Sequence, residues 1–243
     1  MLNVNTMSIV ARDPRTGAVG AATATKLPAV GALVPRAVAG VGAIVTQAWT
    51  NPLLAVDAAA LLAEGRSAGD ALDASLATDP APEIRQIAVM PAVGTPAVHT
   101  GAKTDPWKGH LVERNHVVVG NLLVDGSTLE AMSTAFEDAA DATFAERLVA
   151  AMLAGHRAGG DKRGTRSAAL TIATTEPYPY LDLRVDDHDH PTDELARLHD
   201  LAVEHLLPFV EALPTRAEPG GHLDRSVRED IVERSTHDVP LDG

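Results

Sequence analysis

Thr6 is the first residue of the chain that could act as a reagent, and it opens the apolar run at residues 7–12. A threonine hydroxyl becomes a nucleophile when a base removes its proton, and an N-terminal threonine carries that base in its own α-amino group, whose ordinary pKa is about 7.7–8.0. Thr6 would therefore suit acyl transfer to its hydroxyl. The five residues Met1–Asn5 precede it. Removal of the initiator methionine would leave the rest of this leader in place, so the chemistry requires cleavage of the Asn5–Thr6 bond or a different start of translation.

The run Asp186–His190, "DDHDH", is the second group that could do chemistry. Carboxylates and imidazoles bind zinc and hard cations, so a metal-dependent hydrolase built on His188 and His190 is one interpretation. Adjacent residues of one short loop rarely all face a single ion, however, and acidic residues before Pro191 complement the dipole of a helix that begins there. We favour the start of a helix at this position and predict neither a metal nor another cofactor.

Composition narrows the classes of partner. The formal net charge of −13 argues against nucleic acid and anionic membranes, because both require lysine and arginine to meet phosphates. A small molecule or a peptide is the expected substrate, and a homo-oligomer is left open. The chain has no cysteine, which excludes disulfides and thiolate chemistry. Its start does not resemble a signal peptide and no window reaches the apolar length of a membrane span, so we expect a cytoplasmic protein.

The elements that would position these residues can be predicted from apolar periodicity and turn residues. Strands are expected at 7–12, 19–25, 41–49, 84–90, 97–100, 117–123, 167–173 and 180–185. Helices are expected at 53–64, 67–77, from 127 to near 140, from 143 to near 158, and at 192–213. Two of these helices begin with a capping-box pattern, Ser127 with Glu130 and Thr143 with Glu146.

The order of the predicted elements is strands, two helices, strands, two helices, strands and a helix. This grouping favours an α+β fold of stacked antiparallel sheets covered by helices over an alternating parallel sheet. Residues 6–214 would form the main domain. Residues 215–243 are polar, with mixed charge and few core residues, and are expected to form a loosely held tail.

Several unusual short motifs occur in an order that resembles a protein family whose function is unknown, DUF1028. They include "SIVARDP", "QAW", "HTG", "GNLL", "GGDKRG", "SAAL" and "YPYLDLRVDDH". The resemblance spans roughly residues 6–213. The family is grouped with the N-terminal-nucleophile (Ntn) hydrolases, which implies a four-layer αββα sandwich and an amidohydrolase that uses Thr6 as its nucleophile. A catalytically silent Ntn-like protein that binds a ligand is the alternative.

The resemblance also implies roles for residues near the nucleophile. Lys26 would be a cation that lowers the pKa of the Thr6 hydroxyl and amine, or simply an exposed lysine in a turn. Asn121 would donate to a tetrahedral oxyanion, or would only tolerate a tight conformation after Gly120. Ser167 would hydrogen-bond the amine, or serve as an ordinary strand residue.

The loop "GGDKRG" and a set of polar and aromatic residues complete the candidates. Asp161 would orient the amine, and Arg163 would bind a substrate carboxylate. The expected lining of a substrate pocket comprises Gln47, Trp49, Asn51, His99 and Trp107.

Overall fold

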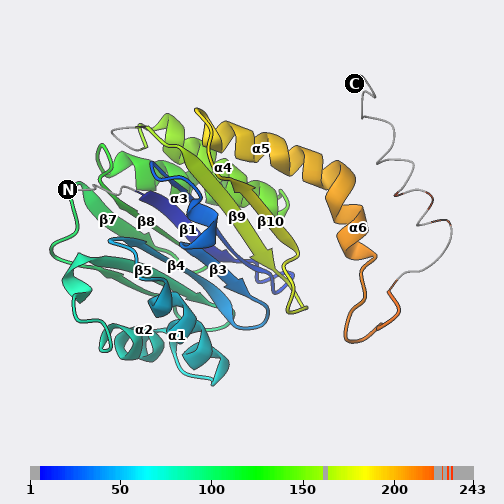
Figure 1. Cartoon of the computed structure of the whole chain (residues 1–243), viewed down its shortest axis with the longest axis horizontal. Helices are drawn as coiled ribbons and strands as arrows, with labels where there is room; N and C mark the ends of the chain where they lie inside the picture. The colour runs from blue at the N-terminus through cyan, green and yellow to red at the C-terminus, as the bar shows by residue number, and fades with distance from the viewer. Residues whose placement is uncertain (1–5, 161–163, 222–225, 227–228, 230, 232–243) are drawn as a thin grey trace. The chain divides into compact units, whose positions relative to one another are not determined.

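The structure of the 243-residue chain is a computed structural model, and it describes residues 6–160, 164–221, 226, 229 and 231 (Figure 1). The chain divides into two compact units, Met1–Ala196 and Arg197–Gly243. The strands among the described residues all belong to the first unit. Asp161 and Arg163 lie outside the described residues, as does most of the predicted tail.

The first unit is built on two antiparallel sheets. The larger sheet has the strand order β10-β9-β2-β1-β8-β7. Its strands are β1 (Thr6–Arg12), β2 (Val19–Thr25), β7 (Lys108–Val112), β8 (His116–Asn121), β9 (Ser167–Ala173) and β10 (Leu181–Val185). The smaller sheet has the order β3-β4-β5-β6, with β3 (Pro35–Val38), β4 (Gly42–Ala48), β5 (Arg85–Pro91) and β6 (Ala97–Thr100).

The two sheets pack face to face. Strand β1 contacts β4 and β5, and β2 contacts β3 and β4. Small and β-branched residues fill most of the space between the sheets, among them Val10 and Val19 from one sheet and Val45 and Ala88 from the other. Because side chains alternate along a strand, Val10 and Ser8 face the smaller sheet while Met7 and Ile9 face the opposite side.

Helices cover the outer face of each sheet, as Figure 1 shows. Helices α3 (Ser127–Asp138) and α4 (Phe144–Arg157) pack on the larger sheet, where Met7 reaches Gly155 of α4. Helices α1 (Pro52–Ala63) and α2 (Ala68–Leu76) pack on the smaller sheet, where Leu54 and Ala58 of α1 and Leu72 of α2 join a cluster with Ile44 and Ile87. The α+β class and the stacked antiparallel sheets of the sequence prediction are therefore observed.

Most predicted elements occur within one or two residues of their expected bounds. Two short strands, β3 and β7, were not predicted. The capping box is confirmed at Thr143, whose hydroxyl accepts from the amide of Glu146 while the Glu146 carboxylate accepts from the amide of Thr143. The capping box predicted at Ser127 is wrong, because the Ser127 hydroxyl and amide both donate to Asp125 and the helix begins without a side-chain cap.

The last helical segment is interrupted. Helix α5 (Pro191–Leu201) begins at the predicted proline and is followed by a π-helical turn (Ala202–Leu206) and by α6 (Leu207–Glu211). The sequence pattern predicted one uninterrupted helix over 192–213. Within the part of the chain that the structure describes, no helix combines the length and apolar character needed to cross a membrane.

Candidate functional site

A row of polar side chains crosses the larger sheet at one end of β1. Thr6 is directly opposite Asn121 of β8 and Thr25 of β2, and Thr25 is opposite Ser167 of β9. Residues in such register lie on the same face of a sheet. Thr6, Thr25, Asn121 and Ser167 are each at most 1% exposed, and the Thr6 hydroxyl donates to Thr25 Oγ1 at 3.2 Å. The row therefore forms a buried polar strip beside an otherwise apolar core.

Gln47 of β4 ties this strip to the smaller sheet. Its Nε2 donates to the Thr6 carbonyl at 3.1 Å, to Asn121 Oδ1 at 3.3 Å and to Gln86 Oε1 at 2.8 Å. Its Oε1 accepts from the Ser8 hydroxyl at 2.6 Å. A buried amide in this position fixes its neighbours, since leaving any of them unsatisfied would cost about 1–3 kcal/mol.

The contact with Gln47 sets the orientation of the Asn121 amide. Because Asn121 Oδ1 accepts from Gln47, the Nδ2 donor end of the same amide is turned away from Gln47. Gln86 holds the end of β8 as well, since its Nε2 donates to the carbonyl of Gly120 at 3.1 Å. The two glutamines together place Asn121 rigidly beside Thr6.

Backbone strain collects around this strip. The non-glycine residues with positive φ in the described part of the chain are Ala29, Ala48 and Leu122, at φ of 57°, 67° and 57°. Ala48 directly follows Gln47 and Leu122 directly follows Asn121. Such left-handed conformations cost roughly 1–2 kcal/mol per residue and often mark sites where the position of a side chain is functional.

Ser167 and Lys26, two of the candidate catalytic residues, lie at the ends of neighbouring strands, and their roles in catalysis stay predictions. Ser167 stabilises the turn after β2, because its hydroxyl donates to the carbonyl of Leu27 and accepts from the amide of Val30. Lys26 follows Thr25 but is exposed, and its ammonium lies 4.0 Å from the position that a Cβ on Gly164 would occupy. Lys26 therefore borders the loop that precedes β9.

Asn51 and Trp49 lie at the start of α1. Asn51 is its N-cap: its Oδ1 accepts from the amide of Leu53, and its Nδ2 donates to Asp79 at 2.7 Å. Asp79 also pairs with Arg85, whose Nη1 donates to the Trp49 carbonyl. Burial would raise the pKa of Asp79, but the hydrogen bonds from Arg85 and Asn51 outweigh it and lower the pKa to about 2. Asn51 is thus committed to the helix start, while the Trp49 side chain is 53% exposed.

His99 and Trp107 lie near the edge strands. The His99 ring contacts the Pro82 carbonyl through Nε2 at 2.9 Å. Trp107 is half-buried against two glycines, since a Cβ on Gly109 or Gly126 would lie 2.6 or 3.0 Å from its ring. Of the five predicted pocket residues, Gln47 is hydrogen-bonded to Thr6.

Several residues of the polar strip were not predicted from the sequence as members of the site. Thr23 and Thr25 alternate along β2 and face Ser8 and Thr6, so the period-two hydroxyls in "TAT" were an available signal. Lys108 completes the row opposite Asn121 and donates to the carbonyls of Gly101, Ala102 and Thr104. No pattern around Lys108 indicated a strand.

The "DDHDH" segment leads into α5. The amide of His190 donates to His188 Nδ1 at 3.0 Å, and the helix begins at Pro191. Among the described residues, no group of three or more histidine, aspartate and glutamate side chains is placed to hold a metal ion.

Comparison with known proteins identifies the fold and the family. A family model described as "Family of unknown function (DUF1028)" matches residues 6–195. The crystal structure of protein SPO2555 from Silicibacter pomeroyi, which carries the same family model, superimposes with a TM-score of 0.82 at 32% sequence identity. The alignment covers 90% of this chain and 100% of that one. No curated protein matches the sequence.

Proposed function

The chain belongs to the DUF1028 family, and from this premise and the polar strip around Thr6 we propose that it is an amide hydrolase of the Ntn type. Its substrate is a small molecule or short peptide, and its nucleophile is Thr6. The polar strip carries the proposal. Thr6 is the first residue of a strand inside the larger sheet, and buried hydrogen-bonding groups from both sheets converge on it.

The proposed reaction has two steps. The free amine of Thr6 takes the hydroxyl proton as Oγ1 attacks the amide carbonyl, the carbon–nitrogen bond breaks, and the proton passes to the leaving amine. Water then hydrolyses the ester on Thr6, which releases the acid and restores the hydroxyl. Asn121 stabilises the oxyanion through Nδ2, and Gln47 positions Asn121 by occupying its Oδ1.

The free-energy cost of burying these polar side chains supports a functional role for the strip. Apolar side chains fill most of the space between the sheets. Further apolar side chains at the end of β1 would therefore stabilise the fold most. The chain instead buries Thr6, Ser8, Gln47, Gln86 and Asn121 and adds two strained residues beside them. Such local conflicts with the rules of packing are typical of functional sites.

The proposal requires the leader to be removed. While Thr6 is bonded to Asn5 its nitrogen is a planar amide, whose delocalised lone pair cannot act as a base. The Thr6 side chain is also only 1% exposed, so its hydroxyl must become accessible before a substrate can reach it.

A covalent probe tests the proposal without knowledge of the substrate. A variant that begins Met-Thr6 should lose its methionine and then react with a β-lactone, adding one acyl group that peptide mapping locates on Thr6. In the same variant Thr6→Ser should still react and Thr6→Ala should not, whereas the full chain with its leader should stay unlabelled. Thr23→Ser is the matched control, because it changes a buried strand hydroxyl outside the proposed chemistry. Labelling that is equal with and without the leader, or absent from the trimmed chain, would refute the proposal.

The burial of Thr6 favours one second candidate, a catalytically silent ligand-binding protein. The Thr6 hydroxyl is already engaged by Thr25, as a purely structural threonine would be. An intact mass spectrum of the protein purified from its native cells separates the two. A chain that starts at Thr6 supports the hydrolase, and a chain that keeps its leader supports the binding protein.

A further inference from the structure

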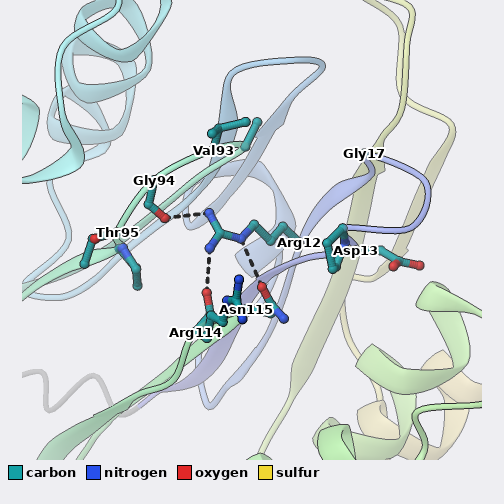
Figure 2. Close-up of a pocket in the computed structure, with 11 residues that line it drawn as sticks. Arg12, Asp13, Gly17, Val93, Gly94, Thr95, Arg114 and Asn115 are labelled. Atoms are coloured by element: carbon teal, nitrogen blue, oxygen red, sulfur yellow. Dashed lines mark hydrogen bonds between the residues drawn. The ribbon is translucent and has the colours of Figure 1, made fainter.

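A second candidate site lies at the far end of β1 from Thr6. Strand β1 begins at Thr6 and ends at Arg12, so six steps of about 3.3 Å separate the two residues by roughly 20 Å. At the Arg12 end is a pocket of about 740 Å³. Its lining comes from the turns between β1 and β2, between β5 and β6, and between β7 and β8 (Figure 2). This volume is in the range of small-molecule sites.

Arg12 connects two of these turns. Its guanidinium donates to the carbonyl of Gly94 at 2.7 Å, to the carbonyl of Arg114 at 2.7 Å and to Asn115 Oδ1 at 3.2 Å, as Figure 2 shows. A further bond reaches the carbonyl of Pro91 at 3.2 Å. These four bonds occupy four of the five N–H groups of the guanidinium, so one N–H on Nη2 is left for a ligand.

The charge of the pocket is positive and unbalanced. All four acceptors of Arg12 are neutral oxygens, and among the described residues neither Arg12 nor Arg114 forms an ion pair. Burial lowers the pKa of Arg12, and the nearby positive charge of Arg114 lowers it further. Two neighbouring guanidinium groups repel each other, and an anion bound beside them would relieve that repulsion.

The acidic residue of the lining does not neutralise this charge. The side chain of Asp13 points away from Arg12 in Figure 2. The Asp13 side chain is 2% exposed, and its carboxylate accepts two hydrogen bonds at 3.1 Å from the guanidinium of Arg15. Asp13 is therefore already paired, and the pocket keeps its positive character in a chain whose net charge is −13.

We propose that this pocket binds an organic carboxylate, with the carboxylate held by Arg114 and the spare N–H of Arg12. The exposed Arg114 guanidinium can take a carboxylate with two parallel bonds, and its backbone is fixed because its carbonyl accepts from Arg12. Ala92, Val93 and Pro96 supply apolar contact for the body of the ligand. Val93 is 90% exposed, which is costly for an apolar side chain without a partner. The site is independent of Thr6, so it would serve recognition or regulation and not the chemistry at Thr6.

The test uses benzoate and benzamide, which share a shape and differ in charge. Calorimetric titration of the full chain should show benzoate binding at least tenfold more tightly than benzamide, and more tightly than inorganic phosphate, which lacks an apolar body. Arg114→Gln should raise the Kd for benzoate at least fivefold. Arg36→Gln, which removes an exposed arginine of β3 outside the pocket, should leave the Kd unchanged.

The amide resonances of a ¹⁵N-labelled sample show where benzoate binds. Benzoate should shift signals of residues 93–95 and 114–115, and circular dichroism should show that Arg114→Gln is folded. Equal affinity for benzoate and benzamide, an unchanged Kd in Arg114→Gln, or shifts confined to other regions would each overturn the proposal. Tighter binding of phosphate than of benzoate would overturn the assignment to an organic carboxylate.

Discussion

Lowering the pH from 7 to 5 should destabilise the first unit through His116. This residue is 1% exposed, its Nε2 lies 2.7 Å from the Ser133 hydroxyl, and its ring packs against Phe136. Burial, helped by the positive charge of Arg147, lowers the pKa of His116 from 6.5 to about 4. Between these two values the unfolded chain binds a proton that the folded chain does not, so stability falls as pH decreases through this window.

The size of the effect follows from the two pKa values. At pH 5 the unfolded state gains about 2 kcal/mol relative to pH 7, and the loss approaches about 3 kcal/mol below pH 4. The pair of Asp79 and Arg85 does not interfere, because the pKa of Asp79 is lowered to about 2 and that carboxylate stays ionised at pH 5.

Urea unfolding at pH 7 and pH 5 measures this effect, followed by the fluorescence of Trp49 and Trp107, which both belong to the first unit. His116→Gln lowers stability at both pH values through lost packing, but the drop between them should be about 2 kcal/mol smaller than in the original chain. His190→Gln, at an exposed position, should leave the drop unchanged. If His116→Gln shows the full drop, the histidine does not titrate as the structure indicates and the reasoning is refuted.

Three further outcomes are expected. Once an amide substrate is known, Asn121→Ala in the trimmed chain should lower kcat about a hundredfold while circular dichroism shows that the variant is still folded, and an unimpaired kcat would leave Asn121 a structural role only. Asp79→Asn should cost about 3 kcal/mol in urea unfolding at pH 7, because it leaves the Arg85 guanidinium, which is only 11% exposed, without its charge partner; a loss below about 1 kcal/mol would contradict this. Replacing both His188 and His190 by alanine should leave activity and metal content, measured by elemental analysis, unchanged, and loss of a stoichiometric metal would restore the metal-site interpretation.

The sequence alone determined most of the local structure, because these signals act over a few residues. The alternation and flanking turns of β1, β2 and β9 predicted their bounds to within one residue, and Thr143 with Glu146 marked the start of α4. The order of elements was enough for the α+β class with stacked antiparallel sheets. The Ser127 cap failed for an equally local reason, since Asp125 competes for the same hydroxyl.

Only the tertiary structure decided what required distant segments to meet. Strands β3 and β7 are short, half-exposed edge strands, and their hydrogen bonds to β4 and β8 define them more than their own composition does. The register of four strands brings Thr6, Thr25, Asn121 and Ser167 into one row, and a one-residue shift of any strand would turn its members to the other face. The pocket at Arg12 likewise exists only because three turns, far apart in the sequence, come together at one end of the sheets. Residue propensity and periodicity describe a few neighbouring residues and do not tell which distant strands or turns meet. The burial and the charge at these positions therefore follow only from the assembled sheets.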